Sequence, residues 1–511
     1  MLLHHFFDNT ICRIPSKIAL VCDGERYTYA DIEARVDQLA RLLRRRGVQR
    51  RDRVALFLDN SVETVVGVYA ALRIGAVFVP INSLTKQDKL AYQLNDSRAS
   101  ALITHAALRR IWQEALATNI TVHTCIVVDG LARTDALTGR CLPYPATNDR
   151  IEGPGVEPPS IDQDLASIIY TSGSTGDPKG VMLTHLNMVS AAHSITTYLG
   201  LQEDDIIICV LPLAFDYGLY QMLMAFKVGA TLVLERSFAF PIKVLEVMAR
   251  ERVTVLPGVP TIFSLLMNLK GLDKFDLSAL RMITNTAAAL SEEHIRRLRG
   301  LFPQATLFSM YGLTECKRVT YLPPEQLDIR PTSVGRGMPN QEVWLVDEFG
   351  RRLPNGSIGE LVIRGSHVMR GYWEKPNETA KRLKPGPLPG EAVLHSGDLF
   401  RTDEEGWLYF VARKDDIIKS RGEKVSPREV ENAIYSIESV LEAVVVGVPD
   451  EVLGQAVKAF LVLKDGHSLT EREVIRHCLA RLENYMAPKY VEFVPELPKT
   501  DTGKIKKRGI A

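Results

Sequence analysis

The chain has 511 residues, of which 46% are hydrophobic and 24% are charged, and its formal net charge at pH 7 is +1. A single hydrophobic core does not accommodate this length, so we expect at least two domains. The near-neutral charge excludes a global field that would attract nucleic acid or an anionic membrane, so any affinity for phosphate must come from local sites.

Seven cysteines are scattered through the chain, and none forms a C-x-x-C pair. The sequence therefore indicates neither a disulfide framework nor a zinc site, and it fits a reducing compartment. The first residues, MLLHHFFDNT, lack the basic start and long apolar core of a signal peptide. No run of about 18 apolar residues occurs either. We expect a cytoplasmic protein without a membrane span.

Strand-like and helix-like segments alternate through the first 150 residues. Apolar residues recur at helical spacing over 30–47, and Gly47 is a suitable end for this helix. The strand RVALFLDN follows, and then a second helix over 61–76 that Ser61 caps. VFVPIN and ALITH are again strand-like. This alternation predicts an α/β sheet with helices packed on its faces.

The alternation resumes with the strands DIIICVLPL, ATLVLE, VTVLPGVP and LRMITNTAAAL. From about Gln341 the pattern changes to short strands with Gly and Asn turns, which predicts an antiparallel β region. The Pro- and Gly-rich segment 374–391 is expected to form a surface loop.

A second boundary falls near residues 412–427. The following residues predict helix, strand, strand and helix, a compact α+β unit of roughly 95 residues. The basic segment 497–511 is expected to be a surface loop. We therefore predict an α/β protein with a large N-terminal domain, residues 1–414, made of stacked α/β sheets and a β-rich subdomain. A small, mobile α+β domain, residues 415–511, completes it.

One short segment, YTSGSTGDPKG at 170–180, has a composition typical of an anion-binding loop. Its three glycines expose backbone N–H groups, and its hydroxyls and one lysine add further donors, which suits a phosphate chain. The loop is not a Walker A motif, because Pro178 stands where the second glycine is required.

Three further motifs accompany this loop: YGLTE at 311–315, the stretch from SGDLF to KVSP at 396–427, and PKTDTGKI at 498–505. Together, in this order and across nearly the whole chain, they resemble the adenylate-forming superfamily. That superfamily includes acyl-CoA synthetases, adenylation domains of nonribosomal peptide synthetases and firefly luciferase. The resemblance implies that a carboxylate attacks the α-phosphate of ATP, which releases pyrophosphate and leaves an acyl-adenylate.

The resemblance also implies a set of nucleotide-binding residues. They are Thr171, Ser172, Gly173, Ser174, Thr175, Gly176, Lys179, Tyr311, Asp398 and Arg413. The loop would hold the β- and γ-phosphates, Tyr311 would pack against the adenine, and the Asp398 carboxylate would accept hydrogen bonds from the ribose hydroxyls. The chain departs from the family at Ala412, where glycine is usual before the arginine.

The catalytic roles are implied in the same way. Thr314 would donate its hydroxyl to the α-phosphate, and the Glu315 carboxylate would bind Mg²⁺, which prefers oxygen ligands. Lys504 would place its ammonium on the charge that develops at the α-phosphate. Asp415 matches the hinge about which the small domain rotates between the two half-reactions.

The acyl pocket is expected after the strand DIIICVLPL, where the chain reads Phe215–Asp216. This pair resembles amino-acid-activating adenylation domains, in which the aspartate pairs with the substrate ammonium. The alternative is that the Asp216 carboxylate bonds to the backbone instead. A buried carboxylate without a partner is costly, so the first case requires a cationic substrate group. Tyr217, Asn285 and Thr286 are further expected walls. Thr286 replaces a common glycine, which hints at a small or medium acid.

Two basic residues, Lys317 and Arg318, follow Glu315. We expect them to be solvated, as most lysines and arginines are. The alternatives are that they attract a second carboxylate or the phosphopantetheine arm of the acceptor.

The leading hypothesis is an enzyme that forms acyl-AMP from a small-molecule carboxylic acid and ATP with Mg²⁺, and then transfers the acyl group to the thiol of CoA. Two alternatives stay open. One is adenylation of an amino acid such as proline, with transfer to the phosphopantetheine of a stand-alone carrier protein or to an amine. The other is a nucleotide-binding relative that no longer catalyses, although the presence of Lys179, Thr314, Glu315 and Lys504 speaks against it.

Overall fold

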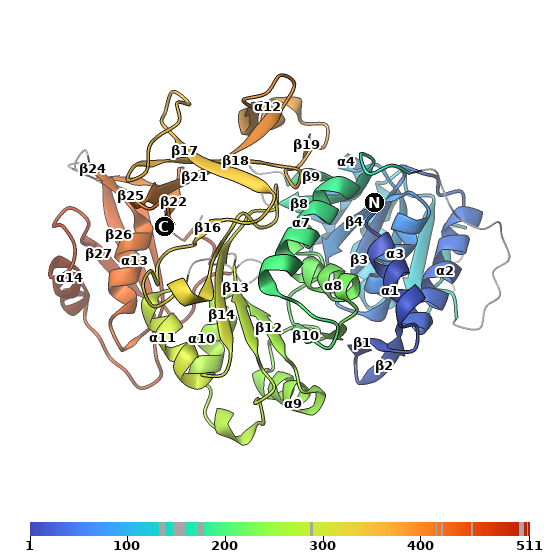
Figure 1. Ribbon diagram of the computed structural model, residues 1–511, viewed down its shortest axis with the longest axis horizontal. Coiled ribbons are helices and arrows are strands. Elements are labelled where there is room, and N and C mark those ends of the chain that lie inside the picture. Colours follow the sequence, from blue (N-terminus) through green and yellow to red (C-terminus); the bar gives the residue numbers. More distant parts are fainter. Residues whose placement is uncertain are drawn as a thin grey trace.

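The computed structural model describes residues 1–131, 139–146, 160–171, 178–286, 290–414, 416–420, 423–450, 453–499, 505–507 and 509–510. Four β-sheets and their helices make up this part of the chain. In Figure 1 the sheet of the C-terminal segment, coloured orange to red, lies at one end of the molecule. The sheet that contains β3 (Arg53–Leu58) and β4 (Val77–Asn82) lies at the other end. No described helix is long and apolar enough to cross a membrane.

An eight-stranded sheet contains the strands predicted in the first 130 residues. Its order is β19 (Gly371–Tyr372), β9 (Lys179–Thr184), β8 (Leu165–Thr171), β4 (Val77–Asn82), β3 (Arg53–Leu58), β5 (Ala99–His105), β6 (Thr124–Val128) and β7 (Cys141–Pro143). The central strands β4, β3, β5 and β6 are parallel. They are buried along nearly their whole length, as is typical of parallel strands covered on both faces.

The helices of this region confirm the predicted caps. They are α2 (Tyr29–Arg45), α3 (Val62–Arg73), α4 (Gln87–Asp96) and α5 (Arg109–Ala117). Thr28 and Asp31 form a capping box at the start of α2, and Gly47 lies just beyond its end with φ +85°. The Ser61 side chain caps α3 by accepting a hydrogen bond from the Thr64 N–H at 3.4 Å.

A nine-stranded sheet contains the strands at whose ends some of the predicted site residues lie. Its order is β16 (Arg336–Gly337), β15 (Thr320–Leu322), β14 (Thr306–Tyr311), β13 (Met282–Asn285), β12 (Val255–Gly258), β10 (Ile206–Cys209), β11 (Thr231–Leu234), β1 (Ile18–Cys22) and β2 (Glu25–Thr28). The strands from β11 to β14 are parallel. Asn285 and Tyr311 end β13 and β14, so both lie at the carboxyl edge, where parallel α/β sheets bind ligands.

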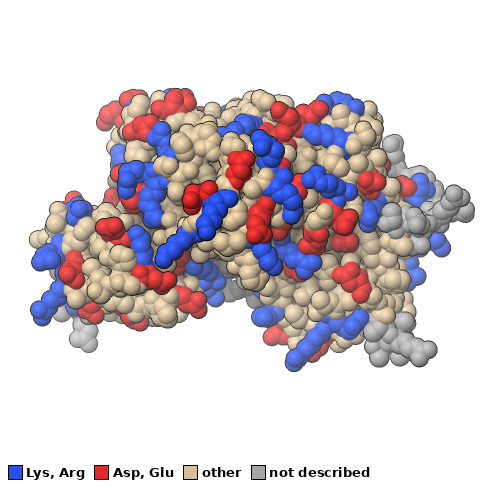
Figure 2. All heavy atoms as spheres, turned by 90° about the horizontal axis from the view of Figure 1, so that it is seen from below, with Lys and Arg blue, Asp and Glu red and all other residues tan. Residues whose placement is uncertain are grey.

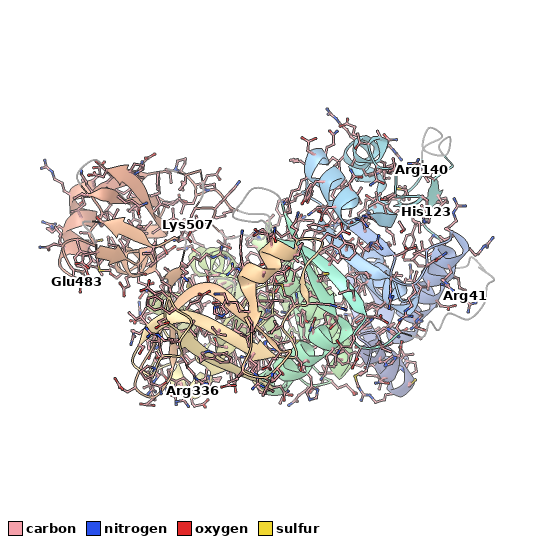
Figure 3. All side chains as sticks on the ribbon, turned by 90° about the horizontal axis from the view of Figure 1, so that it is seen from above. Arg41, His123, Arg140, Arg336, Glu483 and Lys507 are labelled. Carbon is pink, nitrogen blue, oxygen red and sulfur yellow. The ribbon has the colours of Figure 1, made fainter. Side chains whose placement is uncertain are left out.

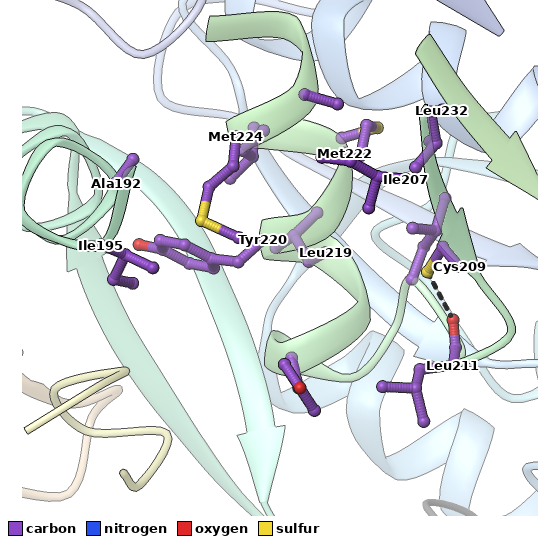
Figure 4. Packing of buried hydrophobic residues seen from close by; sticks show 14 of the residues in the cluster. Ala192, Ile195, Ile207, Cys209, Leu211, Leu219, Tyr220, Met222, Met224 and Leu232 are labelled. Carbon is purple, nitrogen blue, oxygen red and sulfur yellow. Dashed lines mark hydrogen bonds between the residues drawn. The ribbon is translucent and has the colours of Figure 1, made fainter. Parts of the chain in front are cut away.

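Further helices accompany these strands, and one of them is buried on nearly all sides. The helices are α1 (His5–Arg13), α7 (His185–Leu199), α8 (Asp216–Val228), α9 (Pro241–Glu251), α10 (Pro260–Asn268) and α11 (Glu292–Leu301). Figure 4 shows α8 in the core, with Tyr220 beside Ile195 of α7 and Met222 beside Ile207 of β10. This packing fixes the first turn of α8, where Asp216 and Tyr217 lie.

The predicted antiparallel region is a third sheet. It contains β17 (Gln341–Val346), β18 (Ile358–Gly365), β21 (Ala392–Thr402) and β20 (Leu383–Pro385) in this order, with β22 (Leu408–Arg413) also paired to β21. The expected surface loop at 374–391 is wrong in part, because it contains α12 (Pro376–Arg382) and β20. Pro376 stands in the first turn of α12, where proline costs no backbone hydrogen bond, so this proline starts a helix.

The last sheet confirms the α+β pattern predicted for the C-terminal segment. Its order is β24 (Glu423–Val425), β23 (Ile418–Ser420), β26 (Gly454–Leu463) and β25 (Val440–Asp450), with β27 (Tyr490–Phe493) paired to β26; α13 (Pro427–Tyr435) and α14 (Glu471–Leu479) accompany it. A hydrophobic cluster of its own, which includes Ile434, Leu461 and Val474, packs this unit.

The surface agrees with the small net charge of the chain. On the face shown in Figure 2, basic and acidic side chains are interspersed over the whole surface. Such a face does not attract a polyanion as a whole, so phosphate must be bound by local groups.

Gly218 tests how closely α8 is held. A Cβ atom at this position would lie 2.3 Å from the Pro212 carbonyl oxygen, which is backbone and cannot swing away. We expect Gly218→Ala to lower the free energy of unfolding by about 1–3 kcal/mol, as overpacked core substitutions do. The measurement is the denaturant midpoint. The matched control is Gly300→Ala in α11, whose Cβ would meet nothing within 4 Å, and equal effects of the two substitutions would contradict the packing described here.

Candidate active site

Three of the predicted nucleotide-binding residues lie together at the end of β14. The Tyr311 hydroxyl donates a hydrogen bond to Asp398 Oδ2 at 2.6 Å, and Arg413 Nε lies 3.9 Å from Asp398 Oδ1. Antiparallel pairing of β21 with β22 places Asp398 directly opposite Arg413. Burial raises the pKa of the Asp398 carboxyl, although Arg413 and Tyr311 act to lower it. Ala412, which stands where the family usually has glycine, pairs with Leu399 of β21 as a regular residue of β22.

A second group surrounds Glu315. The Tyr372 hydroxyl donates a hydrogen bond to Glu315 Oε1 at 2.7 Å. Lys179 Nζ lies 5.6 Å from the centroid of the Tyr372 ring and forms an ion pair with Glu378 of α12. Pairing of β19 with β9 sets Tyr372 opposite Val181, two residues from Lys179 on the same strand. The helix that replaces the expected loop thus supplies a partner of the predicted phosphate-binding lysine.

Arg382, the last residue of α12, connects the two groups, and sequence reasoning missed it. Its Nη1 donates to the His395 carbonyl oxygen at 3.3 Å, and a Cβ on Gly397 would lie only 2.0 Å from this nitrogen. Burial acts to lower the pKa of Arg382, but nearby acidic groups, including Glu315 and Asp398, raise it above its usual value. The signal available in the sequence was a proline-started helix ending in arginine shortly before the SGDLF motif.

Glu360 of β18 holds the backbone of that motif. Its Oε1 accepts a hydrogen bond from the Gly397 N–H at 2.9 Å, and its Oε2 accepts one from Lys414 Nζ at 3.1 Å. Burial would raise the pKa of the Glu360 carboxyl, but His395, Lys414 and the Gly397 N–H lower it to about 2. Glu360 is therefore charged at neutral pH and ties the SGDLF turn to the residue just before the predicted hinge.

The expected acyl-pocket residues come from two places in the fold. Phe215, Asp216 and Tyr217 lie at the start of α8, whereas Asn285 ends β13 and Thr286 follows it. The Tyr217 hydroxyl connects them, since it lies 2.8 Å from the carbonyl oxygen and 2.7 Å from Oγ1 of Thr284 in β13.

The prediction that Lys317 and Arg318 are solvated is wrong, because these residues are only 1% and 2% exposed. The loop after β14 folds back on itself: a Cβ on Gly312 would lie 1.9 Å from the Lys317 carbonyl oxygen, and Lys317 has φ +68°. This tight turn directs both side chains inward. Arg318 Nη1 lies 3.9 Å from Asp216 Oδ2, and the guanidinium carbon lies 4.3 Å from the centroid of the Tyr217 ring.

The Lys317 ammonium donates a hydrogen bond to the Thr314 carbonyl oxygen at 3.0 Å and lies 5.9 Å from the Tyr220 ring centroid. Burial lowers the pKa of this lysine to about 8, although the nearby carboxylates of Asp216 and Glu315 act to raise it. The buried side chain therefore still carries its proton at neutral pH.

Several predicted residues lie outside the described residues. They are Ser172, Gly173, Ser174, Thr175 and Gly176 of the phosphate loop, the hinge residue Asp415 and the catalytic lysine Lys504. Thr171 ends β8, and its hydroxyl donates a long hydrogen bond, 3.5 Å, to the Lys179 carbonyl oxygen, so the two ends of the loop are held together.

The burial of Lys317 has a consequence for stability. Between pH 8 and 10.5 the folded protein has released the Lys317 proton while the unfolded chain still binds it, so the free energy of unfolding gains a contribution that rises with pH. We expect the difference between wild type and Lys317→Met to shift in favour of the wild type over this range. Denaturant unfolding at several pH values measures it, with exposed Lys384→Met as the matched control. A pH-independent difference would contradict the buried ammonium.

Comparison with known proteins agrees with this geometry. Residues 7–373 match the AMP-binding enzymes, and residues 429–504 match the C-terminal domain of AMP-binding enzymes. A long-chain-fatty-acid–CoA ligase of Bacillus subtilis (strain 168) is 32% identical over 99% of this chain and 93% of its own length.

Two solved structures cover 99% of this chain. The anthranilate CoA ligase AuaEII in complex with anthranoyl-AMP has a TM-score of 0.89 at 28% identity over 95% of its length. ATP-bound MatB from Rhodopseudomonas palustris has a TM-score of 0.86 at 30% identity over 98% of its length. These findings confirm the resemblance and do not favour the amino-acid-activating or non-catalytic alternatives. The chain belongs to the AMP-binding enzyme family and is an AMP-forming acid–thiol ligase that uses ATP to activate a carboxylic acid.

Proposed function

We propose that the protein joins a carboxylic acid to the thiol of CoA in two half-reactions that share one site. The observation that carries this proposal is the group of Asp398, Tyr311 and Arg413 beside Glu315 at the carboxyl end of β14. It offers a buried acceptor for ribose hydroxyls and a carboxylate for a metal ion within one connected set of side chains. We propose that the enzyme acts in the cytoplasm, which fits its scattered cysteines.

In the first half-reaction an oxygen of the substrate carboxylate attacks the α-phosphorus of ATP. The bond from the α-phosphorus to the oxygen bridging to the β-phosphorus breaks, and pyrophosphate leaves with that oxygen and its electron pair. We assign ribose binding to Asp398, because hydrogen bonds from two hydroxyls would stabilise its buried carboxylate. Lys179 and the loop that begins at Thr171 would hold the pyrophosphate portion, and the Thr314 hydroxyl would contact the α-phosphate.

The residues present fit a magnesium ion at Glu315. Tyr372 occupies Oε1 of this carboxylate, whereas Oε2 accepts no hydrogen bond from any residue in the described part of the chain. An oriented carboxylate with one available oxygen is a suitable ligand, since Mg²⁺ binds through one or two carboxylates together with substrate phosphates. When bound, the ion would neutralise charge on the phosphates. The Tyr372 hydroxyl orients the Glu315 carboxylate for this role.

In the second half-reaction the CoA sulfur attacks the acyl carbonyl carbon, and the bond from this carbon to the oxygen that links it to the α-phosphorus breaks. AMP leaves with that oxygen and its electron pair, and the thiol proton passes to solvent. We keep the division into residues 1–414 and 415–511, with Asp415 as the hinge and Lys504 as the lysine of the first half-reaction. Support comes from Lys507, three residues further on: its ammonium bonds Glu431 Oε1 of α13 at 2.7 Å, and Figure 3 places it in the C-terminal body. Lys507, which follows the lysine motif, thus belongs to the unit that would rotate.

Lys504→Ala tests the assignment of the first half-reaction. We expect acid-dependent ATP–pyrophosphate exchange to fall by about 100- to 1,000-fold, the size of effect that removing one electrostatic catalyst has. Thioester formation from supplied acyl-AMP and CoA should fall far less. Lys506→Ala, at an exposed lysine two residues away, is the matched control. Equal loss in both half-reactions would contradict the role of Lys504.

The acceptor is tested with free CoA. We expect CoA to produce an acyl-CoA of the predicted mass and a stoichiometric release of AMP with any acid that supports pyrophosphate exchange. Turnover that required a phosphopantetheinylated carrier protein, with none on free CoA, would overturn the choice of CoA while leaving adenylation intact.

A further inference from the structure

We propose that the acid carries a second carboxylate, remote from the one that reacts, and that Arg318 binds this second group. The inference rests on the proposed function, because it assumes that the start of α8 lines the acyl pocket. It makes the substrate a dicarboxylic acid, of which only one carboxylate is activated.

Arg318 is a buried cation that the described protein does not satisfy. Its side chain is 2% exposed, it donates no hydrogen bond to any described residue, and its Nε is among the buried nitrogens that lack a partner there. A guanidinium has five N–H donors, and burying even one of them unpaired, as at Nε here, is expensive. Natural proteins leave few such groups, so this one requires a ligand or a structural explanation.

Asp216 is the obvious structural explanation, and its distance makes it insufficient. Arg318 Nη1 lies 3.9 Å from Asp216 Oδ2, which is beyond hydrogen-bonding range. A buried arginine–carboxylate pair that serves stability alone is expected to be hydrogen-bonded and bidentate, since only good geometry offsets the cost of removing both charges from water. Asp216 therefore lowers the electrostatic cost of Arg318 without occupying its donors.

The charges around Arg318 also favour an anion. Lys317 is buried beside it, with one hydrogen bond to the Thr314 carbonyl oxygen. Two buried basic side chains, Lys317 and Arg318, thus lie in a region where Asp216 is the carboxylate nearest to the guanidinium. Glu315 already accepts a hydrogen bond from Tyr372 and is the proposed metal ligand. One additional negative group would balance the acyl end of the site.

The position of the guanidinium identifies which anion fits. Arg318 is held over the Tyr217 ring, and the Tyr217 hydroxyl is fixed by Thr284, so the plane of the guanidinium is oriented before a ligand binds. A planar fork of donors matches a carboxylate, which it can bind through two parallel hydrogen bonds. A simple fatty acid would place an apolar tail against these unpaired donors. The site should therefore discriminate strongly against an acid that lacks the second carboxylate.

The test is acid-dependent ATP–pyrophosphate exchange with pairs of equal carbon number: butanoate and butanedioate, hexanoate and hexanedioate, octanoate and octanedioate, 4-methylbenzoate and benzene-1,4-dicarboxylate. We expect at least one dicarboxylate to exceed its partner in kcat/KM by about 100-fold or more. Monocarboxylates equal to or better than their partners would overturn this inference and leave the proposed function standing. Exchange with none of these acids would contradict both.

Arg318→Met tests the residue itself. The readout is the ratio of kcat/KM for the best dicarboxylate to that for its monocarboxylate partner, which cancels any loss of folded enzyme. We expect the ratio to fall by about 30-fold or more, and Arg318→Lys, which keeps the charge but not the fork, to give an intermediate ratio. The matched control is Arg336→Met. Arg336 also stacks on an aromatic ring, that of Trp407, but it is exposed and lies at the edge of the molecule in Figure 3. An unchanged ratio in both Arg318 variants would overturn the assignment.

Discussion

The site at the end of β14 depends on the pairing of buried and partly buried carboxylates with cations and hydroxyl groups. Asp398, Glu315 and Asp216 bring three carboxylates to this region, and charges removed from water are tolerated only with partners or at the cost of a shifted pKa. Arg413 and the Tyr311 hydroxyl face Asp398, and the Tyr372 hydroxyl faces Glu315.

The nucleotide end and the acyl end of the site differ in their balance of acidic and basic side chains. At the nucleotide end, Asp398 and Glu315 each accept one hydrogen bond from a tyrosine hydroxyl of the described chain, and the remaining carboxylate oxygens suit ribose hydroxyls and a metal ion. At the acyl end two buried cations share one aspartate, so the excess is positive. A negative group at the far end of the acid is complementary to this positive acyl end. The same balance explains why Asp216 does not require a substrate ammonium, since Arg318 already provides its cation.

Much of the fold was predictable because its strands are continuous apolar runs and its helices carry recognisable caps, as at Ser61 and Gly47. The site residues of the motifs were predictable for a different reason: four short segments in order identify the family. What sequence periodicity did not reveal was α12, with Glu378 and Arg382, because its first residue is a proline in a Pro- and Gly-rich stretch. The burial of Lys317 and Arg318 was missed because it arises from a backbone turn at Gly312 that no hydrophobic pattern records.

The most direct test of this account is a crystal structure of the enzyme with Mg²⁺, ATP and the dicarboxylic acid that gives the strongest pyrophosphate exchange. We predict adenylate density with its ribose hydroxyls on Asp398 and the free carboxylate of the acyl group in a two-point hydrogen bond with Arg318. A free carboxylate directed to solvent, with Arg318 in direct hydrogen bonds to Asp216, would contradict the claim that unmatched buried charge selects the substrate.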